Sequence, residues 1–502
     1  MKTRTVQLSI ICVAVTMLLS ACNDWLDVKS SSELDRKDLF KNETGYAEAL
    51  TGVYSGMSGT SLYGRTLTFL VPDLLAGYAA SGMPGGSIAE WQNYSYKHSD
   101  ENRNASVIEV IDRIWLDMYN QIANLNAMLE CIDQDRNLFS GDNYRILKGE
   151  AKGLRAFLHF ELLRMFGEPY SIGRDNRCIP YVDELSTDIF PLLTVDEALI
   201  RVIEELKEAR ELLVNDPIHL GTEPSEVLAP LPSDTYNRWQ EFVATYHNRR
   251  FCFNYYAAIA TLARAYLWKG DKVNALACAK EIIADQEKRF PWVTTDNLTR
   301  IGMNDQYSYN QDRTFATEHI FALNIEKLEE YIDGYTYQGE NSLDQYSMPV
   351  SYAGEFFYTG KDIRSQYLLT TIGYYKYSSK FYQSNVVLPC FQKRMPLIRL
   401  SEMYYIAAEC EPDSADGLKW LDCVRSHRGL TDELFTGTED VKNEVMSEYQ
   451  KEFMGEGQLW FYYKRKVASS IPNAYSFSGD PALYTFDRPE DEDIYGGRVT
   501  GE

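Results

Sequence analysis

An apolar pattern with helical spacing runs through the central part of the chain. Between Ile108 and Ile132 the apolar residues are separated alternately by three and four positions, which places them on one face of a helix. A second such run extends from Tyr144 to Met165 and ends at Gly167-Glu168-Pro169, a combination that stops a helix. The sequence therefore predicts two long core helices that form an antiparallel hairpin.

Shorter helices are predicted after this pair. Thr194 and Glu197 form a capping-box pattern, and the helix that they start continues to Asn215 before a proline. From Asn254 to Ile283 two short helices meet at Gly270, with small and aromatic residues facing each other, which resembles a tetratricopeptide unit. Less regular helical patterns cover residues 398–408, 415–427 and 441–454.

Two stretches, residues 58–104 and 291–395, interrupt the helical pattern. The second has no sustained helical period, and some short strands are expected there. Its tyrosines are Tyr307, Tyr309, Tyr331, Tyr335, Tyr337, Tyr346, Tyr352, Tyr358, Tyr367, Tyr374, Tyr375, Tyr377 and Tyr382. Long irregular insertions in a helical scaffold are more often functional than accidental, so we expect ligand binding there. We predict an all-α, tetratricopeptide-like repeat scaffold over about 30–57, 105–290 and 396–460, with the two stretches as insertions.

The first 21 residues are predicted to be removed from the mature protein. Lys2 and Arg4 precede an apolar run from Val6 to Leu19, which is too short for a bilayer core that needs about 20 residues. The quartet Leu19-Ser20-Ala21-Cys22 resembles the lipobox of bacterial lipoproteins, in which the cysteine sulfur takes a diacylglycerol. Residues 1–21 are thus predicted to be a signal peptide, and Cys22 to be the lipid anchor of a body that covers 22–502.

Composition and motif searches disfavour several classes of function. The 73 acidic residues outnumber the 50 basic ones, and the net charge of −23 repels a phosphate backbone, so no nucleic-acid partner is expected. The nine cysteines contain no CxxC pair and lie mostly in helical patterns, where small buried residues are expected. The histidines are scattered, and no HExxH, GxSxG, P-loop or GxGxxG motif occurs. We therefore predict no catalytic residue, no metal site, no cofactor and no enzymatic activity.

Aromatic residues in the insertions suit a sugar ligand. A sugar ring can pack its C–H face on an aromatic ring while phenol and amide groups bond its hydroxyls. The strongest cluster is Trp91, Asn93 and Tyr94, which lie close to a loop rich in glycine and serine. The predicted ligand-binding residues are Tyr78, Trp91, Asn93, Tyr94, Tyr307, Tyr309, Tyr335 and Tyr337. Tyrosines on helical patterns are expected in the core instead, namely Tyr119, Tyr255, Tyr256, Tyr266, Tyr404 and Tyr405.

A series of short motifs extends from residue 25 to residue 494. In chain order they are Trp25-Leu26-Asp27, Tyr119-Asn120-Gln121-Ile122-Ala123-Asn124, Gly149-Glu150-Ala151-Lys152-Gly153-Leu154-Arg155-Ala156-Phe157, Phe166-Gly167-Glu168-Pro169, Pro396-Leu397-Ile398-Arg399-Leu400-Ser401-Glu402, Val424-Arg425-Ser426-His427-Arg428-Gly429, Glu452-Phe453-Met454-Gly455-Glu456-Gly457 and Arg488-Pro489-Glu490-Asp491-Glu492-Asp493-Ile494. The ordered set resembles the SusD/RagB family of nutrient-binding outer-membrane lipoproteins of Bacteroidetes. One departure is the segment 458–465, which lacks the arginine and aspartate of the family pattern and suggests a divergent branch.

The resemblance implies a function as well as a fold. A member would sit on the cell surface, bind an oligosaccharide without catalysis, and deliver it to a SusC-like TonB-dependent transporter barrel in the outer membrane. The family's motif residues are structural, so they are expected to serve the scaffold here, which the resemblance describes as four tetratricopeptide-like units. A peptide-binding relative, a surface hydrolase and a tetratricopeptide-type adaptor remain as alternatives.

Overall fold

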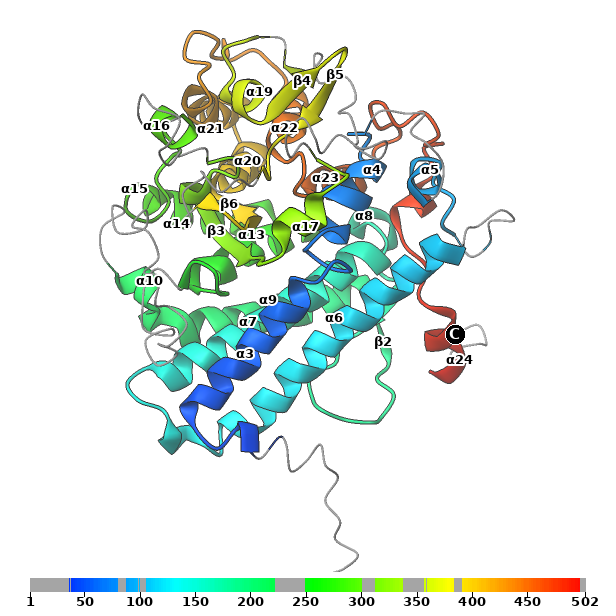
Figure 1. Ribbon diagram of the computed structural model, residues 1–502, viewed down its shortest axis with the longest axis vertical. Coiled ribbons are helices and arrows are strands. Elements are labelled where there is room, and N and C mark those ends of the chain that lie inside the picture. Colours follow the sequence, from blue (N-terminus) through cyan, green and yellow to red (C-terminus); the bar gives the residue numbers. More distant parts are fainter. Residues whose placement is uncertain are drawn as a thin grey trace, which may run out of the picture.

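Long helices run across the lower half of the molecule in the view of Figure 1. The structure is a computed structural model that describes residues 36, 38–79, 87–97, 99, 105–221, 249–299, 312–336, 356–357, 359–382 and 391–496. Its lower helices are α3 (Glu43–Met57), α6 (Ala105–Ile132), α7 (Asn143–Phe166) and α9 (Val195–Leu212). α3 packs along α6, and α7 packs between α6 and α9. The long helices predicted from the apolar spacing are therefore confirmed.

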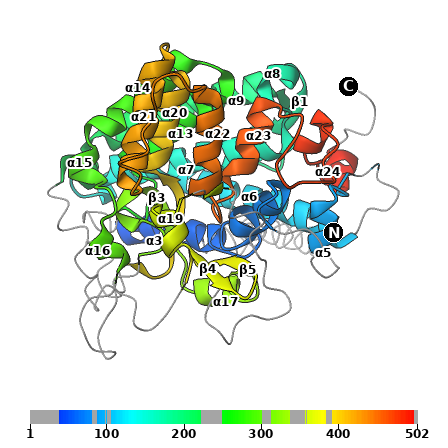
Figure 2. The ribbon, with the colours of Figure 1, turned by 90° about the horizontal axis from the view of Figure 1, so that it is seen from above.

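Shorter helices continue this packing into the rest of the fold. They are α13 (Tyr255–Lys269), α14 (Lys272–Ala284), α20 (Leu400–Cys410), α21 (Ser414–His427), α22 (Val441–Glu452) and α23 (Gln458–Lys466). α13 packs on α9 and α14, α14 on α20, and α20 on α21, so successive helix pairs lie side by side (Figure 2). Gly270 joins α13 to α14 with a φ of +83°, a left-handed conformation that glycine adopts most easily.

Single helical turns and short helices occur between these elements. They are η1 (Thr66–Leu70, a π-helical turn), α4 (Val71–Leu75), α5 (Ser87–Gln92), η2 (Arg136–Leu138), α8 (Tyr170–Gly173), η3 (Leu213–Asn215), α10 (Pro217–Leu220), α15 (Gln286–Arg289), α16 (Thr295–Leu298), η6 (Ala316–Glu318), α17 (Leu328–Ile332), α19 (Ile363–Tyr367), η9 (Pro481–Tyr484) and α24 (Glu490–Tyr495). The predicted insertion 58–104 thus contains η1, α4 and α5, so it is more helical than expected.

Three small antiparallel sheets complete the described part of the fold. β1 (Arg177–Pro180) pairs with β2 (Leu192–Thr194), β3 (His319–Asn324) with β6 (Arg394–Arg399), and β4 (Leu369–Ile372) with β5 (Tyr375–Ser378). In the β3–β6 ladder Asn324 lies opposite Arg394 and His319 opposite Arg399, so this ladder joins two segments about 70 residues apart and holds the base of the second insertion together. The short strands expected in this region are confirmed. The helix predicted from residue 398 is corrected, because Ile398 and Arg399 still belong to β6 and α20 begins at Leu400.

Close packing explains the glycines of the motif in α7. A Cβ at Gly149 would lie 2.8 Å from the Leu213 side chain, and one at Gly153 would lie 2.2 Å from the Phe253 ring. Neighbouring side chains therefore occupy the space that larger residues would need. The capping box predicted for α9 is also present, since Glu197 N donates to Thr194 Oγ1 at 3.2 Å and Thr194 N donates to Glu197 Oε2 at 2.9 Å.

The described core agrees with the expectations for cysteines and helical tyrosines. Cys178, Cys252, Cys278 and Cys410 are buried free thiols, and Cys131 and Cys423 are free and partly buried. The tyrosines expected in the core are buried, except that Tyr119 is partly buried and packs against it. α23 was not predicted, and it occupies the segment 458–465 that departs from the family pattern. Within the described ranges, none of the helices combines the length and the apolar character that crossing a membrane requires.

Candidate functional site

The predicted cluster around α5 is packed into the protein. Trp91 is 2% exposed, and its ring centroid lies 5.6 Å from that of Tyr96 and 6.0 Å from that of Phe486. Tyr94 is 3% exposed, and its ring lies 5.1 Å from that of Phe477. The C-terminal segment that carries Phe477 and Phe486 therefore covers these rings. The expectation that Trp91 and Tyr94 present open faces to a sugar is corrected by this burial.

Tyr78 is a packing residue for the same reason. It is 3% exposed, and its hydroxyl donates to the backbone oxygen of Gln450 at 2.8 Å. The hydroxyl of Tyr94 likewise donates to the backbone oxygen of Leu75, at 2.5 Å. Because these phenols already have backbone acceptors, they tie helices together and do not offer their donors to a ligand.

The other predicted residues differ in position. Asn93 is exposed at the surface beside Trp91. Tyr335 is half-buried, with its ring 6.0 Å from that of Phe69, and it shares a cavity of about 30 Å³ with Tyr78. Tyr307, Tyr309 and Tyr337 lie outside the described residues. The structure thus brings Tyr78 and Tyr335 together, but in a cavity too small for a sugar.

Asn93 lines an open pocket of about 210 Å³, here called the amide pocket. Its lining residues are Leu74, Gly77, Ala79, Ala89, Gln92, Asn93, Asn473, Ala474, Tyr475 and Ser476. Asn93 Oδ1 accepts a hydrogen bond from Ser476 Oγ at 3.1 Å, which joins the end of α5 to the C-terminal segment. Tyr475, which lines the pocket, is 68% exposed, so much of this residue is accessible to solvent.

The chemistry of the amide pocket suits a neutral, hydroxyl-rich ligand. Gln92, Asn93 and Asn473 carry amide groups that both donate and accept hydrogen bonds, and Ser476 adds a hydroxyl. The exposed ring of Tyr475 adds an apolar surface. The volume is below the roughly 300–1,000 Å³ of pockets that enclose a whole drug-sized ligand, so the pocket fits one unit of a longer chain. No carboxylate occurs among its described lining residues.

Sequence reasoning did not find Tyr475, Asn473 or Ser476 as site residues. Each lies in a C-terminal segment without a regular element, more than 370 positions from Asn93. The cluster of small and polar residues around Asn473 is the only local signal, and it is equally typical of an ordinary turn. The contact between this C-terminal segment and α5 could not be inferred from its composition.

A larger pocket, of about 420 Å³, lies where α7 ends against the C-terminal segment. Its lining carries Lys97, Arg177 and Arg488 together with Glu168, Asp487 and Asp493. Lys97 pairs with Asp487 at 2.5 Å and Arg488 with Asp493 at 2.9 Å. Because charges of both signs line this pocket and two of its three basic groups already pair with carboxylates, it shows no preference for a charged ligand.

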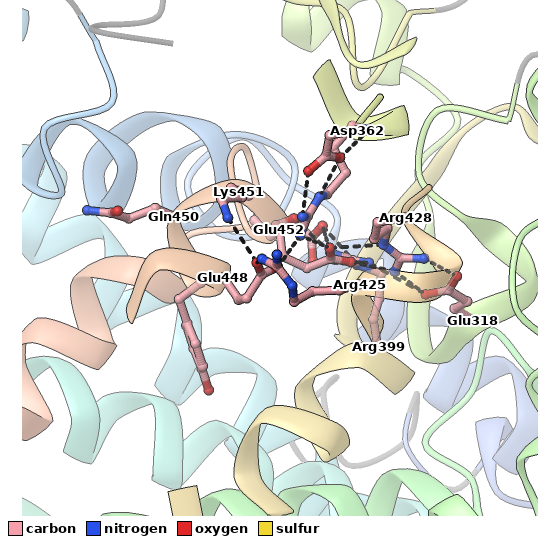
Figure 3. Close-up of polar contacts among 12 residues, drawn as sticks. Glu318, Asp362, Arg399, Arg425, Arg428, Glu448, Gln450, Lys451 and Glu452 are labelled. Atoms are coloured by element: carbon pink, nitrogen blue, oxygen red, sulfur yellow. Dashed lines mark hydrogen bonds and ion pairs between the residues drawn. The ribbon is translucent and has the colours of Figure 1, made fainter. Parts of the chain in front are cut away.

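The charged residues of the family-like motifs meet in a buried ion network (Figure 3). Glu452 of α22 accepts hydrogen bonds from Arg364, Arg399 and Arg428. Arg428 also forms a two-bond pair with Glu318, at 2.9 and 2.7 Å. The side chains of Arg364, Arg428, Glu318 and Glu452 are 0% exposed. These groups therefore hold α22, α21, β6 and the second insertion together.

The other motif charges are paired in the same manner. Arg155 pairs with Glu205, Glu150 with Arg249, and Glu402 with Arg264 at 2.6 Å. Burial alone would raise the pKa of Glu448, but Arg364 and Lys451 lower it to about 2. Paired, fully ionised carboxylates of this kind are poor proton donors, and loss of one partner leaves an uncompensated buried charge. The expectation that the motif residues serve the scaffold agrees with this geometry.

The β4–β5 hairpin carries Tyr374, the most exposed tyrosine of the described residues. Tyr374 is 100% exposed and Tyr375 is 57% exposed. Gly373 precedes Tyr374 in the two-residue turn and has a φ of +59°, as a type II′ turn requires at its first central position. The hairpin lies at the top of the molecule in Figure 1.

The part of the chain that the structure describes contains no group of three or more His, Cys, Asp and Glu side chains that could hold a metal ion.

Comparisons with known families give two matches along the chain. A family described as "Starch-binding associating with outer membrane" matches residues 24–229, and the SusD family matches residues 303–494. The first description names starch binding, and the second names the family alone. Among curated proteins, SusD-like protein P2 of Formosa agariphila is 24% identical over 286 residues, which cover 55% of this chain. The chain spans 46% of the length of that relative.

Solved structures share the fold over most of the chain. A SusD superfamily protein from Bacteroides thetaiotaomicron gives a TM-score of 0.69 at 19% identity, covering 91% of this chain and 98% of that one. A laminarin-binding SusD-like protein gives a TM-score of 0.59 at 18% identity, with the same coverage. At these identities the likeness establishes the arrangement of helices and strands.

Proposed function

Because this chain belongs to the SusD family, we propose that it captures an oligosaccharide at the outer membrane without catalysing a reaction. The amide pocket is the observation that carries the proposal. It combines an exposed aromatic ring, that of Tyr475, with the amides of Asn93 and Asn473, which are the groups that a sugar requires. The laminarin-binding neighbour makes a neutral glucan a suitable first ligand to test.

Anchoring and delivery form the second half of the proposal. Acylation of Cys22, which the lipobox predicts, would hold the protein on the membrane, and residues after it would form the start of a tether. A SusC-like TonB-dependent barrel would receive the ligand. The resemblance of the motifs to those of the family supports this arrangement.

Tyr475→Ala is expected to weaken binding of a neutral oligosaccharide about tenfold, because an aromatic contact contributes up to about 1.5 kcal/mol beyond its buried area. Isothermal titration calorimetry with laminari-oligosaccharides and a panel of other glycans and peptides would measure it. Tyr495→Ala is the matched control, because Tyr495 is 77% exposed and does not line the pocket. Binding of peptides alone, or hydrolysis of a bound glycan, would contradict the proposal.

Extraction of the native protein from its membrane tests delivery. In mild detergent, a large barrel protein is expected to co-purify with it in equal amounts, and mass spectrometry would identify both. Cys22→Ser is expected to remove the acyl groups and release the protein from the membrane fraction. If the lipidated protein were extracted alone, the adaptor and hydrolase alternatives would take precedence.

A further inference from the structure

The β4–β5 hairpin differs in charge from the rest of the chain. The protein has 73 acidic residues among 502, but no Asp or Glu occurs between Asp362 and Glu402. Asp362 and Glu402 are themselves buried and paired with Arg364 and Arg264. The hairpin therefore contributes a basic group, Lys376, and no carboxylate of its own.

The hairpin exposes Tyr374 fully and Tyr375 in large part, whereas Thr370, Ile372, Lys376 and Tyr377 are partly buried. In the register of the ladder, Ile372 lies opposite Tyr375 and Thr370 opposite Tyr377, so these four side chains share one face. Tyr374 stands in the turn between the strands, and Lys376 lies opposite Thr371 on the reverse face. Because a lysine stem is long and flexible, its ammonium group can reach the tip beside Tyr374.

These features together select an anionic sugar chain over other ligands. A net charge of −23 repels anions, so an anionic ligand is bound most easily where carboxylates are missing. Charges separated by more than about 8 Å are largely screened at physiological salt, so distant carboxylates that contribute to the net charge act only weakly on an anion bound next to Lys376. Exposed tyrosine rings pack on sugar rings, and one lysine pairs with a carboxylate or sulfate.

We propose that the β4–β5 hairpin is a contact site for an anionic oligosaccharide, with Tyr374 and Tyr375 packing on its sugar rings and Lys376 pairing with its carboxylate or sulfate. The proposal rests on the proposed function and adds a second contact, in which a charged unit of the oligosaccharide lies on the hairpin while the amide pocket takes a neutral unit. The hairpin site is separate from the amide pocket, because none of its residues lines that pocket.

The test uses the purified full-length protein in mild detergent and calorimetric titration. Tetragalacturonate supplies carboxylates, its fully methyl-esterified form is the neutral match, and a κ-carrageenan tetrasaccharide supplies sulfates. The wild type is expected to bind one of the two anionic probes at least about fivefold more tightly than the methyl ester, and added salt should weaken that preference. The better of the two identifies the anionic group.

Two variants assign the effect to the hairpin. Tyr374→Ala is expected to weaken anionic binding about fivefold, and Lys376→Gln should remove both the preference for the anion and its dependence on salt. Tyr495→Ala and Lys419→Gln are the matched controls, because Tyr495 is 77% exposed and the Lys419 side chain is 75% exposed elsewhere on the surface.

Several outcomes would overturn the proposal. They are binding of neither anionic probe, equal affinity for the acid and its ester, or unchanged affinity in Tyr374→Ala. A Tyr374→Ala variant that kept its glycan affinity but lost a co-purifying membrane protein would assign the hairpin to a protein partner instead. If neutral glycans still bound through Tyr475, only the hairpin proposal would fail, whereas absence of all glycan binding would remove the proposed function too.

Discussion

Replacing Glu452 with Gln is expected to lower the free energy of unfolding by about 3–5 kcal/mol, because it leaves buried arginines without their counter-charge. The carboxylate of Glu452 accepts from Arg364, Arg399 and Arg428, and it is 0% exposed. An amide of the same size offers one acceptor oxygen and turns an NH₂ group toward the guanidinium groups. Urea unfolding followed by circular dichroism would measure the loss.

Glu208→Gln is the control for this variant. Glu208 pairs with Lys152 at 2.8 Å, but its side chain is 59% exposed. Since solvent screens such a pair, its loss should cost at most about 1 kcal/mol. Equal effects of the two substitutions would mean that the network around Glu452 is not the stabilising unit that its geometry indicates.

The sequence predicts the long helices well because their signal is local. The spacing of apolar residues in α6 and α7 needs only the chain itself, and the capping box at Thr194 lies within four residues. Errors occurred where a distant segment decides the structure. Ile398 continues a helical pattern, but it lies in β6 opposite Phe321 of β3, because the ladder between these strands satisfies its backbone groups.

The candidate site was harder to predict for a related reason. Trp91 and Tyr94 stand in a loop-like context that suggests exposure, yet Phe477 and Phe486 cover them from a segment more than 380 positions away. Aromatic content alone therefore could not separate Trp91 from Tyr475. Asn93 is the exception, since it is the predicted residue that the structure places in the amide pocket.

The motif charges show the same limit. The order of the motifs along the chain was sufficient to recognise the family. It was not sufficient to predict which charged residues form pairs. Arg428 bonds Glu318, 110 residues away, and Arg399 bonds Glu452, 53 residues away. Pairing of this kind connects the second insertion to the helices, so the insertion that carries the β4–β5 hairpin is held on the scaffold by buried ion pairs.

Stability between pH 6.5 and 4 is expected to change little, because buried groups oppose one another there. Burial lowers the pKa of His159 to about 3, so its contribution is complete above pH 6.5 and is lost as the pH falls toward 3. Its Nδ1 lies 2.9 Å from the backbone oxygen of Arg155, and its Nε2 accepts from Val182 N, which fixes the neutral form. Burial also lowers the pKa of His319 well below its usual value, so this group acts in the same direction as His159. Burial raises the pKa of Asp73 to about 8 and that of Asp312 to about 7, and their opposite contributions are lost as the pH rises.

Below about pH 4.5 the carboxylates paired with basic residues dominate, and stability is expected to fall steeply by several kcal/mol, about 1.4 kcal/mol for each unit of pKa shift. Burial would raise the pKa of Glu409, but Arg465 and Lys466 lower it to about 2, as Arg364 and Lys451 do for Glu448. A carboxyl group whose pKa is lowered on folding contributes stability above pH 4.5, which is its pKa in the unfolded chain. That contribution is lost as the pH falls through about 2.

Urea titrations at pH 7, 5.5, 4.5 and 3 would test this dependence on pH. Glu409→Gln should be less stable than the wild type at pH 7 and should lose less between pH 4.5 and 3, because the group that is titrated has been removed. Glu208→Gln, at an exposed pair, should keep the wild-type slope. A wild-type free energy of unfolding that is equal at pH 4.5 and 3, or a Glu409→Gln curve parallel to it, would show that these buried pairs do not control the acid limit of the fold.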